Sequence, residues 1–158
     1  MKFVQQKNKF RMWLSVVVAL LLVGFYIVGS QPTPTPDVQG SVSGMTREAL
    51  WTEANNRREV PLVLDPDLNQ TAQKKCEAMA AANKFEHGDV WAELNFLGRR
   101  VYGENLAEGF ATPKKVVEAW LGSPTHKSNL EDFDWKRVGY GVCTDERSGI
   151  VVVQQFSD

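Results

Sequence analysis

Four polar residues in four separate segments could carry out chemistry. His87 lies in KFEHG, Glu104 in YGENLAEG, Glu118 in VVEAW and His126 in SPTHKSNL. The chain contains only these two histidines. Neutral imidazole is a good ligand for Zn²⁺, and a carboxylate can complete a coordination shell or act as an acid or base. The four segments are far apart in the sequence, so only the fold could bring these side chains together.

Each of the four residues also has an ordinary structural interpretation. A histidine at the end of a helix can stabilise the helix macrodipole, which is the alternative at His87. Glu104 follows a glycine in an extended run, where a glutamate is usually solvated. Glu118 fits the polar face of an amphipathic helix, and His126 fits a surface position in the first turn of a helix. Spacing alone therefore gives only weak support for a cluster.

Other catalytic motifs are absent from the sequence, and the charge distribution excludes one class of partner. There is no G-x-S-x-G, H-E-x-x-H, C-x-x-C or glycine-rich phosphate loop. The first eleven residues hold four basic residues and no acids, so the remainder has 14 basic and 19 acidic residues, a net charge of 14 − 19 = −5. Phosphate affinity comes mainly from Lys and Arg. We therefore expect no nucleic-acid partner.

An apolar run near the N-terminus predicts a membrane segment. Residues 12–28, MWLSVVVALLLVGFYIV, contain no charge and no proline. At roughly 1.5 Å per residue, a helix of this length spans about 26 Å, close to the roughly 30 Å hydrocarbon core. The basic residues precede the run, so residues 1–11 are predicted to be cytoplasmic and the remaining chain to lie outside. Residues 12–29 are predicted to be a transmembrane signal-anchor; the alternative is a cleaved signal that releases a secreted domain.

Composition predicts a linker after the membrane segment, and the compartment predicted for the domain permits a disulfide. Residues 30–45 are rich in Pro, Thr, Gly and Ser, which predicts an extended linker. Cys76 and Cys143 are the only cysteines, and outside the membrane they can form a disulfide. The alternative is two buried free thiols, because sequence does not fix the distance between them.

Residues 46–158 predict one α+β domain. Helical patterns cover residues 45–60, 66–84, 90–100 and 113–122, and three of these helices have an N-cap residue: Thr46, Asp65 and Thr112. A hairpin around DERSG within residues 137–158 and a strand at 101–109 predict a small sheet. Strands and helices do not alternate as they do in a parallel βαβ fold.

The order of these segments resembles the CAP superfamily of cysteine-rich secretory, antigen 5 and pathogenesis-related proteins. It is most similar to the bacterial SCP-like branch. The matching pieces fall between Leu50 and Phe156: ANNRREVPLVLDPDLNQTAQKKCEAMA, FEHG, YGENLAEGF, TPKKVVEAWLGSPTHKSNL and RVGYGV. The resemblance implies an α-β-α sandwich, in which a small, mainly antiparallel sheet lies between helices.

The resemblance also implies a site. The central cleft of the family is lined by two histidines and usually two acids, and in several members the histidines bind zinc or another divalent ion. By position, His87 and His126 take the histidine roles, Glu104 the first acid role and Glu118 the second, with both glutamates as candidate catalytic residues. The segment between His87 and Glu104 is shorter than in many relatives, and the cysteine framework of the eukaryotic members is absent.

SPTHKSNL then has a candidate explanation. Ser123 would cap a short helix and Pro124 would begin it, which places His126 just inside the helix start with its ring toward the cleft.

Three functions are compatible with the resemblance. The first is a membrane-tethered extracellular module whose cleft binds a lipid, peptide or glycan of the cell wall, with or without a divalent cation such as Zn²⁺. The second is a metal-dependent or acid–base hydrolase, such as a protease, and the third is a structural surface domain. We favour the binding module because no nucleophile is visible in the sequence.

Overall fold

A computed structural model describes residues 44–158, so the cytoplasmic tail, the apolar run and nearly all of the predicted linker lie outside the described residues. The elements are α1 (Arg47–Asn55), β1 (Val63–Leu64), α2 (Pro66–Ala82), α3 (Val90–Leu94), the 3₁₀ helix η1 (Asn95–Leu97), β2 (Tyr102–Glu108), α4 (Pro113–Gly122), α5 (Pro124–Glu131), β3 (Arg137–Asp145) and β4 (Gly149–Ser157). None of the helices between residues 44 and 158 combines the length and the apolar character needed to cross a membrane.

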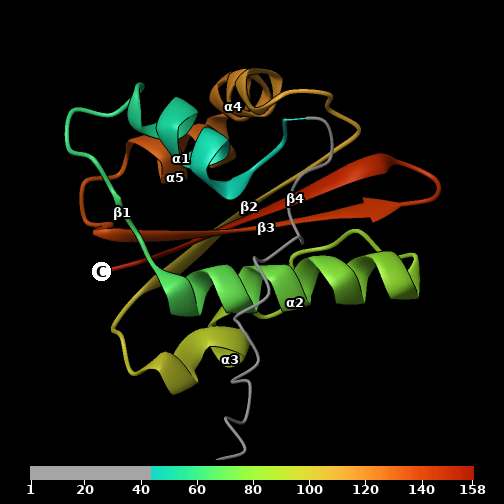
Figure 1. The fold of residues 1–158 in the computed structure, drawn as a ribbon. Coiled ribbons are helices and arrows are strands. Elements are labelled where there is room, and N and C mark those ends of the chain that lie inside the picture. The colour runs from blue at the N-terminus through green and yellow to red at the C-terminus, as the bar shows by residue number, and fades with distance from the viewer. Residues whose placement is uncertain (1–43) are drawn as a thin grey trace, which may run out of the picture. The chain divides into compact units, whose positions relative to one another are not determined.

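The four strands form one mixed sheet in the order β1-β3-β4-β2. β3 and β4 form the predicted hairpin, and β2 pairs with β4 in an antiparallel manner. β1 is parallel to β3 and pairs with only two of its residues, Arg137 and Val138. Helices α1, α4 and α5 cover one face of the sheet, whereas α2 and α3 cover the other (Figure 1). The predicted α+β class is confirmed, and β2 lies at an edge of the sheet.

Most of the helix starts follow from local sequence signals. The side chains of Thr46, Asp65 and Thr112 each accept a hydrogen bond from the backbone N–H three residues further on. Proline is the first residue of both α2 and α4, where its missing N–H costs no helical hydrogen bond. These signals are short-range, which is why the sequence predicts them.

Ser123 departs from this pattern. Pro124 begins α5 as expected, but Ser123 makes no side-chain capping bond, so the predicted cap is wrong. Ser123 also ends α4 by donating its backbone N–H to the carbonyl of Trp120. Its Oγ lies 3.3 Å from Oγ1 of Thr125 instead of reaching the helix backbone.

The apolar core lies on both faces of the sheet. The larger cluster joins the sheet to α1, α4 and α5, and the smaller one joins it to α2. On the α2 face, β3 has no side chain at Gly139 or Gly141, where a Cβ would lie 2.2 Å from backbone atoms of α2. The helix therefore packs directly on the strand, and any larger residue at either position would push the two apart.

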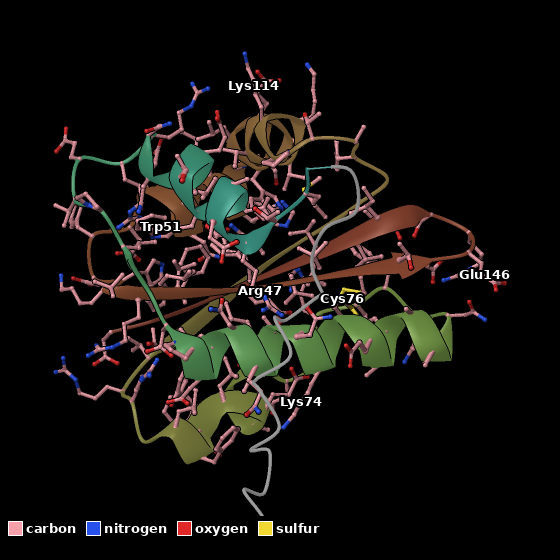
Figure 2. All side chains as sticks on the ribbon, viewed as in Figure 1. Arg47, Trp51, Lys74, Cys76, Lys114 and Glu146 are labelled. Atoms are coloured by element: carbon pink, nitrogen blue, oxygen red, sulfur yellow. A yellow bond between two sulfur atoms is a disulfide. The ribbon has the colours of Figure 1, made fainter. Side chains whose placement is uncertain are left out.

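A disulfide between Cys76 and Cys143 links α2 to β3, with the two Cα atoms 5.9 Å apart. Figure 2 shows the sulfur atoms beside the labelled Cys76, between α2 and the sheet. Of the two alternatives for these cysteines, the structure therefore has the bonded pair. The bond joins the helix covalently to the strand within the smaller cluster.

Within residues 44–158, side chains complete the edge of β3 beyond its short pairing with β1. Asn69 Oδ1 accepts from the Tyr140 N–H at 2.8 Å, and Arg47 Nε donates to the Tyr140 carbonyl at 3.0 Å. The Gln73 amide accepts from the Val142 N–H and donates to the Val142 carbonyl, both at 3.0 Å. One carboxamide thus makes the two hydrogen bonds that a partner strand would supply.

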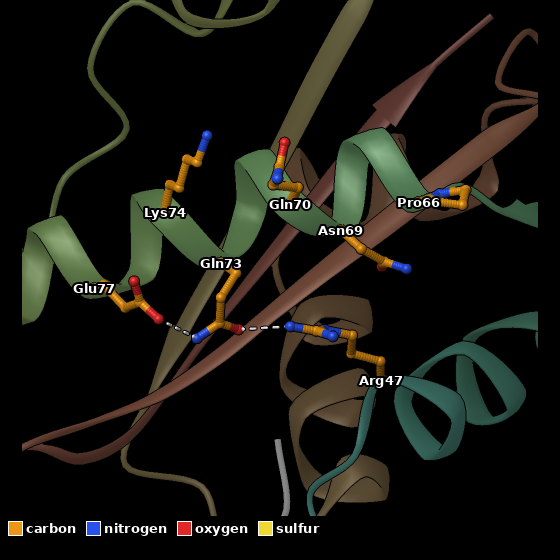
Figure 3. A pocket seen from close by; sticks show the side chains of 7 residues that line it. All are labelled: Arg47, Pro66, Asn69, Gln70, Gln73, Lys74 and Glu77. Carbon is orange, nitrogen blue, oxygen red and sulfur yellow. Dashed lines mark hydrogen bonds between the residues drawn. The ribbon is translucent and has the colours of Figure 1, made fainter. Parts of the chain in front are cut away.

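A pocket of about 470 Å³ lies over this edge (Figure 3). Within it, Gln73 also bonds to Arg47 at 3.1 Å and to Glu77 at 3.0 Å. The complete lining consists of Arg47, Pro66, Asn69, Gln70, Gln73, Lys74 and Glu77. None of these residues belongs to the predicted histidine site, so the pocket is a separate feature of the molecule.

Candidate functional site

His87, Glu104 and His126 come together at the β2 edge of the sheet. Glu104 lies on β2, His87 lies in the segment between α2 and α3, and His126 lies in the first turn of α5. The ring centres of the two histidines are 6.3 Å apart, and His87 Nδ1 lies 3.1 Å from Glu104 Oε1. The fold therefore assembles three of the four residues singled out from the sequence.

Glu118 is not joined to this cluster. Its carboxylate accepts a hydrogen bond from Lys115 Nζ at 2.9 Å and lies 3.9 Å from Lys114 Nζ. The hydrogen bond from Lys115 is the main reason that the pKa of Glu118 is lowered. Among residues 44–158, Glu118 makes no hydrogen bond or ion pair with either histidine or with Glu104. Its position on α4 matches the alternative of a polar helix face.

Glu104 is buried, and both of its carboxylate oxygens have partners. Its side chain is 0% exposed. Gln155 Nε2 donates to Oε2 at 3.0 Å, and Thr71 Oγ1 donates to Gln155 Oε1 at 2.7 Å. Burial raises the pKa of Glu104, against the opposing effects of the Gln155 hydrogen bond, the Lys75 charge and the His87 hydrogen bond.

The contact with Glu104 determines what His87 can offer to a ligand. When the carboxylate is ionised, it can only accept, so His87 Nδ1 carries the proton and donates a hydrogen bond to Oε1. In the neutral ring, Nε2 then keeps its lone pair. The side chain of His87 is 50% exposed, which leaves this ring accessible.

His126 is held close to Glu104 by amide side chains. Asn105 Nδ2 donates to the carbonyl of His126 at 3.2 Å, and Asn129 Nδ2 donates to the carbonyl of Glu104 at 3.1 Å. Burial, together with the charge of a protonated His87, lowers the pKa of His126. Its ring therefore stays neutral, with a free lone pair, to a lower pH than an ordinary histidine.

The residues that support this cluster were not predicted from the sequence. Gln155 and Thr71 order Glu104, and Asn105 holds α5 against β2. Asn105 could have been predicted, because it follows Glu104 in the GENL motif. Lys75 had no recognisable signal: its ammonium lies 3.9 Å from Glu104 Oε1, which depends on how α2 is rotated against the sheet.

The chemistry of the donors fits a divalent cation in an open arrangement. Two neutral imidazoles are good zinc ligands, and Glu104 orients one of them. Zn–N bonds of about 2.0–2.1 Å at a tetrahedral angle would put the ring centres roughly 5 Å apart, so the rings would have to approach each other by about 1 Å. Across residues 44–158, no group of three or more His, Cys, Asp or Glu side chains is arranged to hold a metal ion. His87 and His126 would thus be the protein ligands, and the remaining positions would be open.

The fold and the site together define a class of protein: helices on both faces of a small sheet, with a histidine–glutamate–histidine cluster at the sheet edge. A sequence profile and several known proteins agree with this class. The chain belongs to the CAP, or cysteine-rich secretory protein, family, whose profile matches residues 8–156. The resemblance seen in the sequence is confirmed, including its bacterial SCP-like character.

A curated bacterial protein is similar to most of this chain. The uncharacterized protein YkwD of Bacillus subtilis is 30% identical over 132 residues, which cover 77% of this chain and 50% of that protein. This chain therefore spans about half the length of the curated relative that it matches.

Two solved structures share the fold. An outer surface protein from Borrelia burgdorferi has a TM-score of 0.64 at 21% identity, covering 70% of this chain and 90% of that one. An extracellular protein containing a SCP domain from Bacillus anthracis has a TM-score of 0.58 at 19% identity, covering 70% of this chain and 39% of that one.

Proposed function

We propose that this chain is a membrane-tethered CAP domain that binds a ligand outside the cell through His87 and His126. One arrangement carries the proposal: two imidazoles with ring centres 6.3 Å apart, one of them ordered by a buried carboxylate. Such a pair presents nitrogen lone pairs at the edge of the sheet. A divalent cation bound there would supply a Lewis acid for an oxygen atom of a lipid, peptide or glycan ligand.

The supporting residues act on the histidines and not on the ligand. An ionised Glu104 would hold the proton of His87 at Nδ1 and leave the lone pair of Nε2 available to a ligand. Gln155 keeps the carboxylate in place. Asn105 keeps α5, and with it His126, against the strand that carries Glu104.

Zinc calorimetry on the full chain, purified in detergent, tests this site. His87→Ala and His126→Ala are each expected to weaken zinc binding by about 100-fold or more, because each removes a ligand. Glu104→Gln should weaken binding by about 10–100-fold, the usual effect of losing a carboxylate that orients a ligand. Affinity should also fall as the pH is lowered in the wild type, because a protonated imidazole has no lone pair to give.

Glu118→Gln is the matched control for Glu104→Gln and should leave zinc binding unchanged. Weak binding that is equal in all these proteins and independent of pH would overturn the metal site. It would favour the structural surface domain instead.

The His87–Glu104 pair also favours a second candidate, a hydrolase. An imidazole held by a carboxylate, with its other nitrogen free, can take a proton from a water molecule. Labelled peptides incubated with the same set of proteins separate the two candidates. A hydrolase loses its activity in His87→Ala, whereas a binding module shows no cleavage in any of the proteins.

The proposed position outside the membrane rests on the predicted signal-anchor at residues 12–29 and on the basic residues before it. The disulfide fits an oxidising compartment, and relatives described as an outer surface protein and an extracellular protein fit the same location. We expect protease added to intact cells to digest the domain while a cytoplasmic marker stays whole. A domain that is protected until the cells are lysed would contradict this orientation.

A further inference from the structure

Lys75 projects from α2 into the site and is shielded from solvent there. Its side chain is only 11% exposed. Nζ lies 2.7 and 3.0 Å from the two carboxylate oxygens of Glu93 and 3.9 Å from Glu104 Oε1, and it also donates to the backbone carbonyl of His87. One ammonium group therefore contacts α3, the His87 segment and the buried carboxylate of β2.

The backbone after His87 is pressed against this ion pair. Gly88 has a φ of +67°, and a Cβ there would lie 2.6 Å from Glu93 Oε1 and 3.0 Å from Lys75 Nζ. A residue with a side chain would be strained at this φ, and its Cβ would displace the flexible ends of Glu93 and Lys75. A glycine at position 88 therefore lets the backbone after His87 lie close to this ion pair.

The charges around Lys75 favour this arrangement over a solvated lysine. Two carboxylates, Glu93 and Glu104, face one ammonium group. Attraction between charges strengthens where water is excluded, and the Lys75 end of the contact is largely buried. The neighbouring Lys74 is exposed and lines the separate pocket (Figure 3).

We propose that Lys75 is a positioning residue that holds His87 and α3 as one unit beside Glu104. This inference rests on the proposed function, because the position of His87 matters for a ligand only if His87 belongs to the site. It also makes α3 part of that site. Trp91 of α3 is 52% exposed and packs on Tyr102 of β2, with the ring centres 5.4 Å apart, so α3 also contacts the strand that carries Glu104.

The sign of a change in zinc affinity separates positioning from simple electrostatics. Removing a positive charge near the histidines would by itself tighten the binding of Zn²⁺. Losing the correct position of His87 would weaken it. We expect Lys75→Met to weaken zinc binding by about 10-fold, as the loss of an orienting contact does. Lys75→Arg, which keeps the charge and the donor, should retain most of the affinity, and Lys74→Met should match the wild type.

Hydrogen exchange on the metal-free full chain tests the same role without zinc. In Lys75→Met, amides of residues 87–94 should exchange faster, whereas those of β3 and β4 should stay protected and so report an intact fold. Glu93→Gln weakens the same ion pair by changing the partner of Lys75, so it should give the same exchange pattern. This second variant keeps the test valid if Lys75→Met does not fold.

The two proposals can fail separately. If the wild type binds no zinc but the amides of residues 87–94 exchange faster in Lys75→Met, the metal site is overturned and the role of Lys75 stands. Tighter zinc binding in Lys75→Met, or unchanged exchange over residues 87–94, would overturn the positioning role.

Discussion

Replacing Trp120 by alanine is expected to lower the free energy of unfolding by about 3–5 kcal/mol. The Trp120 side chain is 1% exposed and packs in the larger core cluster, between the sheet and α1, α4 and α5. Its Nε1 donates to the backbone carbonyl of Leu106 at 2.9 Å. The substitution would therefore leave a cavity and also remove the hydrogen bond that satisfies a buried carbonyl at the edge of β2.

Urea unfolding of the two proteins measures this loss. Trp91→Ala is the matched control, because it removes the same side chain from a position that is 52% exposed. We expect it to cost no more than about 1 kcal/mol. A loss at Trp120 as small as that at Trp91 would contradict the packing described for α4.

Removing the disulfide between Cys76 and Cys143 is expected to lower the free energy of unfolding by about 4 kcal/mol. The two cysteines are 67 residues apart in the sequence, so the bond closes a long loop and removes many conformations from the unfolded chain. Unfolding of the oxidised wild type and of the double variant Cys76→Ala, Cys143→Ala measures the difference.

A reductant provides the control for this comparison. It should destabilise the wild type and leave the double variant unchanged, since the variant has no bond to lose. Counting thiols in the denatured, unreduced protein from its native host tests the pairing itself. Two free thiols would contradict it.

The elements that could be predicted from the sequence depend on residues a few positions apart. Asp65 with Pro66, and Thr112 with Pro113, set the starts of α2 and α4 through contacts within one helical turn. The DERSG loop does the same for the hairpin. β1 has no comparable local signal, because its parallel pairing depends on Arg137 and Val138, which are distant in sequence.

The site, too, could be predicted from the sequence only in part. The two histidines and both glutamates were identified through motifs and assigned by position in the chain, but Glu118 lies with two lysines instead. The residues that order the cluster were missed because they come from other elements. Gln155 belongs to β4. Thr71 belongs to α2 and reaches Gln155 only because of the way that α2 packs on the sheet.

The way in which Gln73 completes the edge of β3 has a consequence for the behaviour of many copies together. An uncovered strand edge is a template onto which another chain can add a strand. Here, access to that template is controlled by a few helix side chains, because Gln73 and Asn69 occupy the hydrogen-bonding groups of Val142 and Tyr140. For copies crowded on one membrane, as proposed above, this closure would keep neighbouring domains from joining into a continuous sheet. The surface of α2 would therefore limit self-association through this edge of the sheet, which the apolar core cannot do.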